Sequence, residues 1–582
     1  MIKVSDYIVS PLALGTHANY ECVKAGKTQI HQYVGKWGLP EPFMASMMDD
    51  SLLDEACRET GISPVHYTRF ERMAILAAAR ALQGTHIRPE NEKVMFIIAT
   101  TKGNVELLNE KAQSAHPAPH LLLTEAARHV TAWFRNPNNP LVVCNACISG
   151  LSAQLEAKRM LDSGVCDYAI VIGADVLSPF IVSGFQSFKA TSDSQCRPFD
   201  EDRNGLNLGE AAACIIYSRT NDHCTGALAA TTEKWYLADG AVRNDAFHIS
   251  GPSRTAEGAY RALKYLFDHC DTSDLAFVNV HGTATLFNDE MEAIALGRMG
   301  LNELPAWGLK GYYGHTLGAA GVLETLLSME AADDHTLPAT KGFEHIGVSR
   351  KIGIADTPRQ IQGTSFIKMM SGFGGCNASL LFRKGKEASP ASPTPANRRS
   401  ERTLHTVHIT EREAIIDGTK IQTDGYGLAL LKSLYHTQVG DYPKFHKMDI
   451  LCKLGFIASE LLLNAEAKSE GKTRFTPCED RALLFVGRSA SICADKAYQQ
   501  TIENPDDYYP SPSSFIYTLP NILPGEIALR NKYYGETSYL AQESPECVEH
   551  LIGQLLRCTG VHSVLGGWID ASSTERFETT LY

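Results

Sequence analysis

Short apolar runs alternate along the chain with stretches of helical pattern. The runs predict strands at Val94–Thr101, Leu141–Asn145, Tyr168–Val176, Ala211–Tyr217, Ala276–Val280, Gly363–Met370 and Asn377–Phe382. The stretches between them predict helices at Phe70–Leu82, Ile148–Asp162, Thr255–Phe267 and Thr316–Ala332. Apolar strands that alternate with helices indicate an α/β fold whose sheet is covered by helices on both faces.

A polar stretch with several prolines, residues 386–402, interrupts this pattern and predicts a linker. The chain of 582 residues is also too long for a single core. We therefore predict a body, residues 1–385, and a tail, residues 403–582.

The body contains an internal repeat. A strand turns into a helix at Cys147 and again at His315, and small residues follow both turns. This predicts two related halves, 1–225 and 226–385, that meet at their helix N-termini. Cys147 and His315 would then lie face to face.

Composition excludes several classes of protein. The net charge of −12, with acidic and basic residues interspersed, argues against a nucleic-acid-binding protein. No apolar run is long enough to span a bilayer, and the first residues lack the pattern of a secretory signal. The 15 cysteines are scattered rather than spaced as a disulfide framework, which predicts a reducing cytoplasmic location.

Cys147 is the candidate nucleophile. An apolar strand leads directly into it and a helix follows at once, so the helix dipole is expected to favour the thiolate. Backbone N–H groups of such a turn can bind an oxyanion. Cys144 and Cys147 also form a Cys-x-x-Cys pair, which leaves redox chemistry or half of a zinc site open as alternatives; no second pair at zinc spacing occurs.

Two histidines in glycine-rich turns are the candidate partners of this cysteine. His281 follows a predicted strand, and His315 precedes Thr316, a candidate helix N-cap. A histidine at a helix N-terminus should stay neutral and can donate to a developing enolate. Hydrogen-bonded structural histidines are the simpler alternative for either residue alone.

Three further residues complete the candidate site. Glu324 lies among leucines on the predicted helix after His315, where a carboxylate needs a partner, and Lys310 is the expected one. Phe373 lies in a glycine-rich loop between two predicted strands, which is either a simple hairpin turn or a mobile cover.

Together these motifs resemble the β-ketoacyl synthases of the elongating, two-histidine type, within the thiolase superfamily. The resemblance covers residues 1–385 and rests on motifs in the expected order: Ile8–Leu12, Glu21–Ile30, Arg197–Asp200, Gly209-Glu210, the His281 turn with Asn288-Asp289, Lys310–Gly321 and Gly372–Asn377. It implies a thiolase-like layered αβαβα fold that arose by duplication, with the tail as an additional C-terminal α/β unit.

The resemblance also implies roles. Cys147 would carry the acyl chain, and His281 and His315 would polarise the malonyl thioester carbonyl as CO₂ leaves. Both substrates would arrive on the phosphopantetheine arm of an acyl carrier protein, with no bound cofactor or metal. Carrier proteins are acidic, so a basic patch is expected near the entrance, with Arg69 and Lys102 among the candidates, together with Arg72.

The same resemblance implies that Lys310 and Glu324 support the histidines. The N–H groups of Cys147 and Phe373 would form the oxyanion hole, and Phe373 would act as a gate. The chain departs from the family at Asn145, where threonine is usual, and at Ile148, where a small residue is usual. These departures leave the acyl substrate open.

The tail is similar to the first half in degenerate form. Met448–Leu462 is similar to Glu71–Leu82, Ala482–Ala490 to Val94–Gly103, and Glu549–Asp570 to Leu155–Asp175. The segment expected in the nucleophile's place, Tyr533–Leu540, has no cysteine. We predict an inactive half-synthase, so that the protein is a homodimer or a pseudo-dimer through its fused tail.

The leading hypothesis is a β-ketoacyl synthase that catalyses decarboxylative Claisen condensation in fatty-acid, polyene or polyketide biosynthesis. A thiolase-like acyl-CoA transferase and a non-catalytic subunit similar to a chain-length factor are the alternatives. The presence of Cys147 together with both histidines favours the first.

Overall fold

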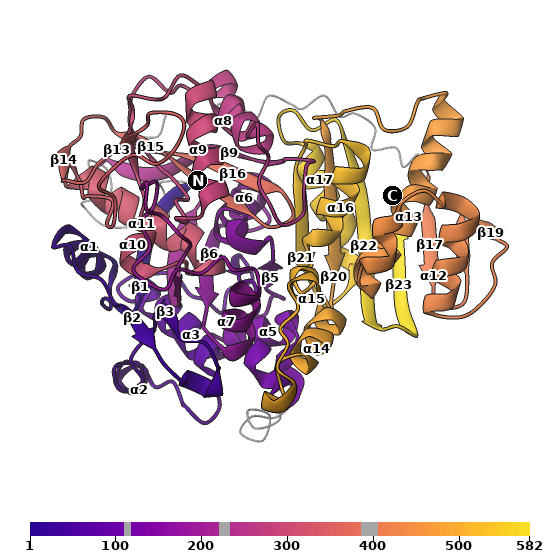
Figure 1. Cartoon of the computed structure of the whole chain (residues 1–582), viewed down its shortest axis with the longest axis horizontal. Helices are drawn as coiled ribbons and strands as arrows, with labels where there is room; N and C mark the ends of the chain where they lie inside the picture. The colour runs from indigo at the N-terminus through magenta and orange to yellow at the C-terminus, as the bar shows by residue number, and fades with distance from the viewer. Residues whose placement is uncertain (110–117, 220–232, 386–404) are drawn as a thin grey trace.

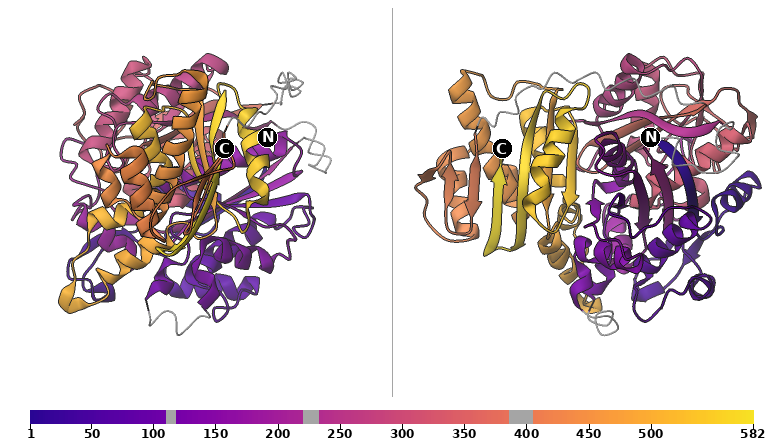
Figure 2. Two further views of the ribbon diagram at one scale, coloured as in Figure 1. Left: turned by 90° about the vertical axis from the view of Figure 1, so that its right-hand side faces the viewer. Right: turned by 180° about the vertical axis from the view of Figure 1, so that it is seen from behind.

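The computed structural model describes residues 1–109, 118–219, 233–385 and 405–582 (Figure 1). The predicted linker, 386–402, and the predicted boundary between residues 225 and 226 lie outside the described residues. Figures 1 and 2 show the body with the tail, in orange and yellow, against one side of it.

The first sheet has five strands in the spatial order β5–β4–β6–β8–β1. β4 runs parallel to β5 and β6, whereas β8 runs antiparallel to β6 and β1. In chain order the strands are therefore arranged 3-2-4-5-1. Their bounds are β1 Ile2–Val9, β4 Val94–Ala99, β5 Leu141–Val143, β6 Tyr168–Asp175 and β8 Ala211–Ser218.

The second sheet repeats this arrangement as β11–β10–β15–β16–β9. β10 is parallel to β11 and β15, and β16 is antiparallel to β15 and β9. Three strands of these two sheets were not predicted: β1 and β9, whose apolar pattern is interrupted by Lys, Asp and Gly, and β11, which has only three residues. The bounds are β9 Lys234–Asn244, β10 Leu275–Asn279, β11 Pro305–Trp307, β15 Ser365–Gly372 and β16 Cys376–Gly385.

Helices form three layers around these two sheets. α3 (Arg69–Leu82) and α5 (Leu123–Trp133) pack outside the first sheet, and α8 (Glu257–His269) and α9 (Leu286–Arg298) outside the second. α6 (Ser149–Asp162) and α11 (Ala320–Asp333) lie between the sheets and are buried along most of their length. The layered αβαβα fold of the body is confirmed.

The tail contains a third sheet with the same strand order, β21–β20–β22–β23–β17. β20 is parallel to β21 and β22, and β23 is antiparallel to β22 and β17. α13 (Ile450–Glu470) and α16 (Ile522–Asn531) pack on one face of it. The bounds are β17 Val407–Thr410, β20 Arg481–Gly487, β21 Thr537–Ala541, β22 Ser563–Ser573 and β23 Arg576–Leu581.

Body and tail share one continuous sheet. β5 pairs antiparallel with β21, with Val143 opposite Leu540 and Val142 opposite Ala541 (Figure 1). These two strands occupy the same position in their respective sheets. Pairing between equivalent strands in antiparallel directions is the pattern produced by a two-fold axis, here an approximate one within a single chain.

Candidate active site

Cys147 lies in a strained turn between β5 and α6. Residues Ala146–Ile148 form a 3-10 turn, η4, and Ala146 has φ 47°, in the left-handed region that non-glycine residues rarely adopt. The Ser149 hydroxyl donates to Ala146 O at 2.6 Å and accepts from Asn145 N at 2.9 Å. These bonds hold the thiol at the end of β5, where Cys147 is 9% exposed.

Two loops of the second half bring His281 and His315 to this cysteine. His281 lies just beyond β10, and His315 lies before the 3-10 turn η6 (Leu317–Ala319) that leads into α11. One nitrogen of each imidazole and the Cys147 sulfur all lie within 4.8 Å of one another. The two ring centres are 5.0 Å apart. The structure thus brings together the three side chains that were expected to converge.

This convergence depends on a close approach of the two central helices. A methyl group on Gly150 would lie 2.9 Å from Gly318 O, and one on Gly321 would lie 2.6 Å from Leu151 N. Larger side chains would push α6 and α11 apart and separate the thiol from the imidazoles. The small residues after both turns therefore allow the close approach of α6 and α11 that the sequence predicted.

Lys310 and Glu324 form the expected ion pair, and a second lysine joins them. Lys310 Nζ donates to Glu324 Oε1 at 2.8 Å and to His281 O at 2.7 Å. Lys368, in β15, donates to Glu324 Oε2 at 2.6 Å and to Val280 O at 3.2 Å. The three ionic side chains are at most 3% exposed. Burial favours a neutral carboxyl, but the two ammonium groups outweigh it and lower the pKa of Glu324.

Both histidines are neutral. Burial, and then Lys310, lowers the pKa of His281 and of His315 well below the usual value. His315 Nδ1 accepts from Leu317 N at 3.3 Å, which places the His315 proton on Nε2. That Nε2 and His281 Nδ1 are buried and have no hydrogen-bond partner among the described residues. Both nitrogens are thus available to a substrate.

Two local expectations at these turns are wrong. Thr316 makes no side-chain cap bond, and α11 begins at Ala320 rather than directly after His315. The helix dipole was expected to lower the pKa of Cys147, but burial raises it to about 12, although Lys310 opposes this. α6 begins at Ser149, beyond the 3-10 turn, so Cys147 is not in its first turn.

Phe373 lies at the tip of the hairpin between β15 and β16, directly beside the nucleophile turn. A methyl group on Gly372 would lie 3.2 Å from Cys147 N. The Phe373 ring lies against Phe185 and Phe188, near the end of α7 (Pro179–Ser187), with ring centres 6.2 and 5.5 Å away. The predicted hairpin is present, and its tip is in contact with the site.

Three buried polar residues that shape the site were not predicted from the sequence: Lys368, Glu292 and Asp175. Glu292 accepts from His281 N at 2.6 Å and from Gly282 N at 2.8 Å, which fixes the His281 turn. Asp175 accepts from Gly318 N at 2.7 Å and from Thr101 N at 3.0 Å. Lys368 could have been found from the sequence, because a lysine inside an apolar strand requires a buried anionic partner.

The donor atoms near Cys147 also resemble a zinc site, as do those of Glu71, His120 and His129. At the first, the ammonium groups that lower the histidine pKa values oppose a divalent cation. At the second, both Glu71 oxygens already accept hydrogen bonds, which accounts for the cluster without a metal. Cys144 Sγ donates to Thr101 O at 3.5 Å and forms no disulfide with Cys147.

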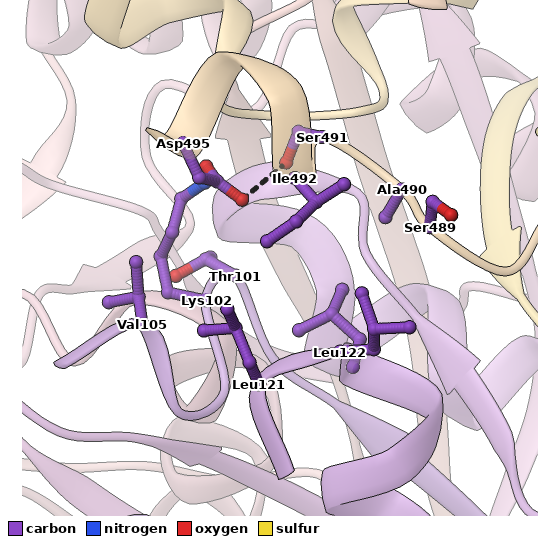
Figure 3. A pocket seen from close by; sticks show the side chains of 11 residues that line it. Thr101, Lys102, Val105, Leu121, Leu122, Ser489, Ala490, Ser491, Ile492 and Asp495 are labelled. Carbon is purple, nitrogen blue, oxygen red and sulfur yellow. Dashed lines mark hydrogen bonds and ion pairs between the residues drawn. The ribbon is translucent and has the colours of Figure 1, made fainter. Parts of the chain in front are cut away.

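All three candidates for a basic docking patch are ion-paired with neighbouring carboxylates. Arg69 binds Glu210 and Asp50, and Arg72 binds Asp54. Lys102 contacts the tail: its Nζ lies 2.7 Å from Asp495 Oδ1 and donates to Thr518 O. Figure 3 shows the Lys102 side chain reaching toward Asp495 between body and tail. The crevice that these residues line has a volume of about 10 Å³.

The tail has a turn equivalent to the nucleophile turn. η10, residues Pro545–Cys547, follows β21 and leads into α17 (Val548–Leu556), as η4 leads into α6. The expected replacement segment, Tyr533–Leu540, lies before this turn, and its second half belongs to β21. In the equivalent turn, the position of Cys147 is taken by Glu546, and Cys547 corresponds to Ile148. No residue of η10 has positive φ.

Comparison with known proteins agrees with this geometry. The family model of the β-ketoacyl synthase N-terminal domain matches residues 9–223, and that of the C-terminal domain matches residues 236–344. Together they cover more than half of the chain. This protein belongs to the β-ketoacyl synthase family. No helix among the described residues is long and apolar enough to cross a membrane.

Individual relatives extend the comparison. A 3-oxoacyl-[acyl-carrier-protein] synthase 2 of Rhizobium meliloti is 31% identical over 286 residues, which cover 46% of this chain and 66% of that protein. The tetracenomycin polyketide synthase ketoacyl synthase alpha subunit of Streptomyces glaucescens is 27% identical over 65% of this chain and 95% of its own. The solved structure of the PfaC keto synthase-chain length factor matches all of this chain and 78% of its own, with TM-score 0.72 and 11% identity. The last of these shows that the whole fold, tail included, has a solved counterpart.

Proposed function

We propose that this β-ketoacyl synthase catalyses decarboxylative condensation of an acyl group carried on Cys147 with a malonyl group carried by an acyl carrier protein. The observation that supports this most strongly is the convergence of one buried thiol and two neutral imidazoles within 4.8 Å. Both substrates would enter on phosphopantetheine arms, and no bound cofactor is needed.

In the first step Cys147 takes the acyl group. Its sulfur attacks the carbonyl carbon of the incoming acyl thioester, the old carbon–sulfur bond breaks, and the thiol proton passes to the departing phosphopantetheine sulfur. Burial raises the pKa of Cys147 to about 12, so a base would assist this transfer, and His281, whose Nδ1 has no partner among the described residues, would relay the proton. The N–H groups of Cys147 and Phe373 would hold the oxyanion.

In the second step the malonyl carboxylate leaves as CO₂, and its electron pair forms an enolate. His315 Nε2–H would donate to the enolate oxygen, and His281 would bind the same oxygen. The enolate carbon attacks the acyl carbonyl on Cys147, the carbon–sulfur bond breaks, and a proton from solution restores the thiol. Lys310 and Glu324 would support the histidine turns, because Lys310 holds His281 O.

The tail would act as the second partner of a pseudo-dimer. It repeats the strand order of the first half and pairs through the equivalent strand, which supports a degenerate half-synthase. Glu546 at the position of Cys147 supports an inactive one. A single chain would then be the working unit, and it would work in the cytoplasm.

Release of labelled CO₂ from malonyl carrier protein tests the reaction. The wild type should release CO₂ and form a β-ketoacyl carrier when an acyl carrier is present, and Cys147→Ala should not form the product. Cys270→Ala, at a half-buried cysteine outside the site, is the matched control. A wild type that transfers acyl groups without CO₂ release would indicate the thiolase-like alternative, and one with neither activity would indicate the non-catalytic subunit.

A further inference from the structure

The tip of the Phe373 loop is held by a residue of the tail. Asn521, immediately before α16, donates from Nδ2 to Phe373 O at 2.7 Å and lies 3.6 Å from Cys376 Sγ. Asn521 is 3% exposed. A buried hydrogen bond of this kind is not readily replaced by water.

Asn521 gains no comparable bond from the tail itself. Its Oδ1 is buried and has no hydrogen-bond partner among the described residues, and its two amide contacts both go to the Phe373 loop. Burying an amide with an unsatisfied acceptor costs stability. The position of Asn521 is therefore explained by its contact with the loop and not by the packing of the tail.

The backbones of loop and tail also approach closely at this point. A methyl group on Gly374 would lie 2.8 Å from Asn521 Nδ2, and one on Gly525 would lie 2.6 Å from Gly374 O. Gly374 has φ 90°, which a side chain would strain. Glycines on both sides thus permit a direct contact between main chains.

The same tail segment touches the Phe373 ring indirectly. Phe515, in α15 (Pro512–Tyr517), lies 5.7 Å from Phe185 and 6.2 Å from Phe188, ring centre to ring centre. Both of those rings lie against Phe373. Residues 515–521 therefore contact the carbonyl of Phe373 directly and its ring through Phe185 and Phe188.

Within the body, two hydrogen bonds anchor the loop, one at Gly374 O and one at Gly374 N, which belongs to the same peptide as Phe373 O. Asn244 Nδ2 donates to Gly374 O at 2.8 Å, and Gly374 N donates to Ile249 O at 2.7 Å. Among the side chains of the described residues, one other group donates to the Phe373 carbonyl. It is the Cys376 thiol, a weak donor, whose sulfur lies 3.3 Å from Phe373 O. Asn521 is thus the strong donor to this carbonyl.

We infer that tail residues 515–521 form a latch that sets the conformation of the Phe373 gate, with Asn521 as its positioning residue. The inference rests on the proposed function, in which Phe373 N–H is an oxyanion donor. The carbonyl of Phe373 and its N–H belong to adjacent peptides, so fixing one restricts φ and ψ and orients the other toward Cys147. Without the latch, fewer molecules have the oxyanion hole formed at any moment.

Asn521→Ala tests the latch, with Asn504→Ala as the control, because Asn504 is an exposed asparagine of the tail whose side chain accepts from Asp506 N nearby. We expect kcat for condensation to fall roughly five- to tenfold, the effect of one net hydrogen bond. The KM for malonyl carrier should change less than about twofold. Hydrogen exchange should accelerate in residues 371–377, and Asn504→Ala should behave as wild type.

Asn521→Leu gives the same comparison with a side chain of similar shape that cannot donate, and it serves if the alanine variant does not fold. Wild-type kcat together with unchanged exchange in residues 371–377 would overturn the latch, while the proposed function stood. A wild type that does not condense at all would refute the proposed function, and hydrogen exchange would still decide whether Asn521 restrains the loop.

Discussion

Replacing Lys368 with methionine removes one of the two ammonium groups that bind Glu324. The lost ion pair spans 2.6 Å, and at an effective dielectric constant of about 20 its attraction is roughly 6 kcal/mol before desolvation. Breaking a buried pair costs about 3–5 kcal/mol net. Glu324 keeps Lys310 at 2.8 Å, so we expect the lower end, about 3 kcal/mol, and a melting temperature lower by about 2–3 °C.

The same substitution should change the pH dependence of condensation. Lys368 is among the groups that hold down the pKa of His281 and of His315, after burial and Lys310. Removing a positive charge makes protonation easier, so both histidine pKa values should rise. Protonated His315 would carry a hydrogen on Nδ1, facing Leu317 N–H, and would lose its orientation. The acid limb of the rate profile should therefore move to higher pH.

The assay is condensation rate against pH from 4.5 upward, roughly two units below the usual histidine pKa, together with a thermal melt. Lys351→Met is the matched control, because Lys351 is an exposed lysine whose partner, Glu303, is exposed as well. It should change neither the acid limb nor the melting temperature. If Lys368→Met also left both unchanged, the electrostatic role assigned to the second lysine would be refuted.

Two further predictions concern the junction with the tail. Phe515 belongs to an apolar cluster that also contains Leu317 and packs against Phe373, so Phe515→Ala should open space near the site and lengthen the acyl chains in the products, as measured by mass spectrometry of carrier-bound species. Arg159 binds Glu536 through two bonds of 2.8 and 2.6 Å, and their side chains are only 11% and 4% exposed, so Glu536→Gln should lower stability by about 3 kcal/mol in a thermal melt; an unchanged melt would contradict this.

Much of the fold could be predicted because its signals are local. The apolar strands β4, β6 and β8 and the helices α3 and α6 follow directly from residue pattern. The small residues after Cys147 and His315 predicted that α6 and α11 pack closely. This close packing explains why Cys147 lies beside His281 and His315. β1 and β9 could not be found in this way, because their burial is set by neighbouring strands rather than by their own sequences.

The site was predictable where chemistry and turn type coincide, as at Cys147, His281 and His315. The pKa of Cys147 was not, because it depends on how deeply the thiol is buried and where α6 begins. Lys368 and the contacts of Asn521 depend on segments far apart in the sequence. Pairing of this kind, including that of Lys102 with Asp495, becomes visible when the tail is placed in three dimensions.

Peptide mass spectrometry after incubation with an acyl carrier protein tests the central claim most directly. The acyl group should appear as a thioester on the peptide that contains Cys147, and adding malonyl carrier should discharge it as a β-ketoacyl product with loss of CO₂. An acyl group found elsewhere, or one on Cys147 that malonyl carrier does not discharge, would contradict the account.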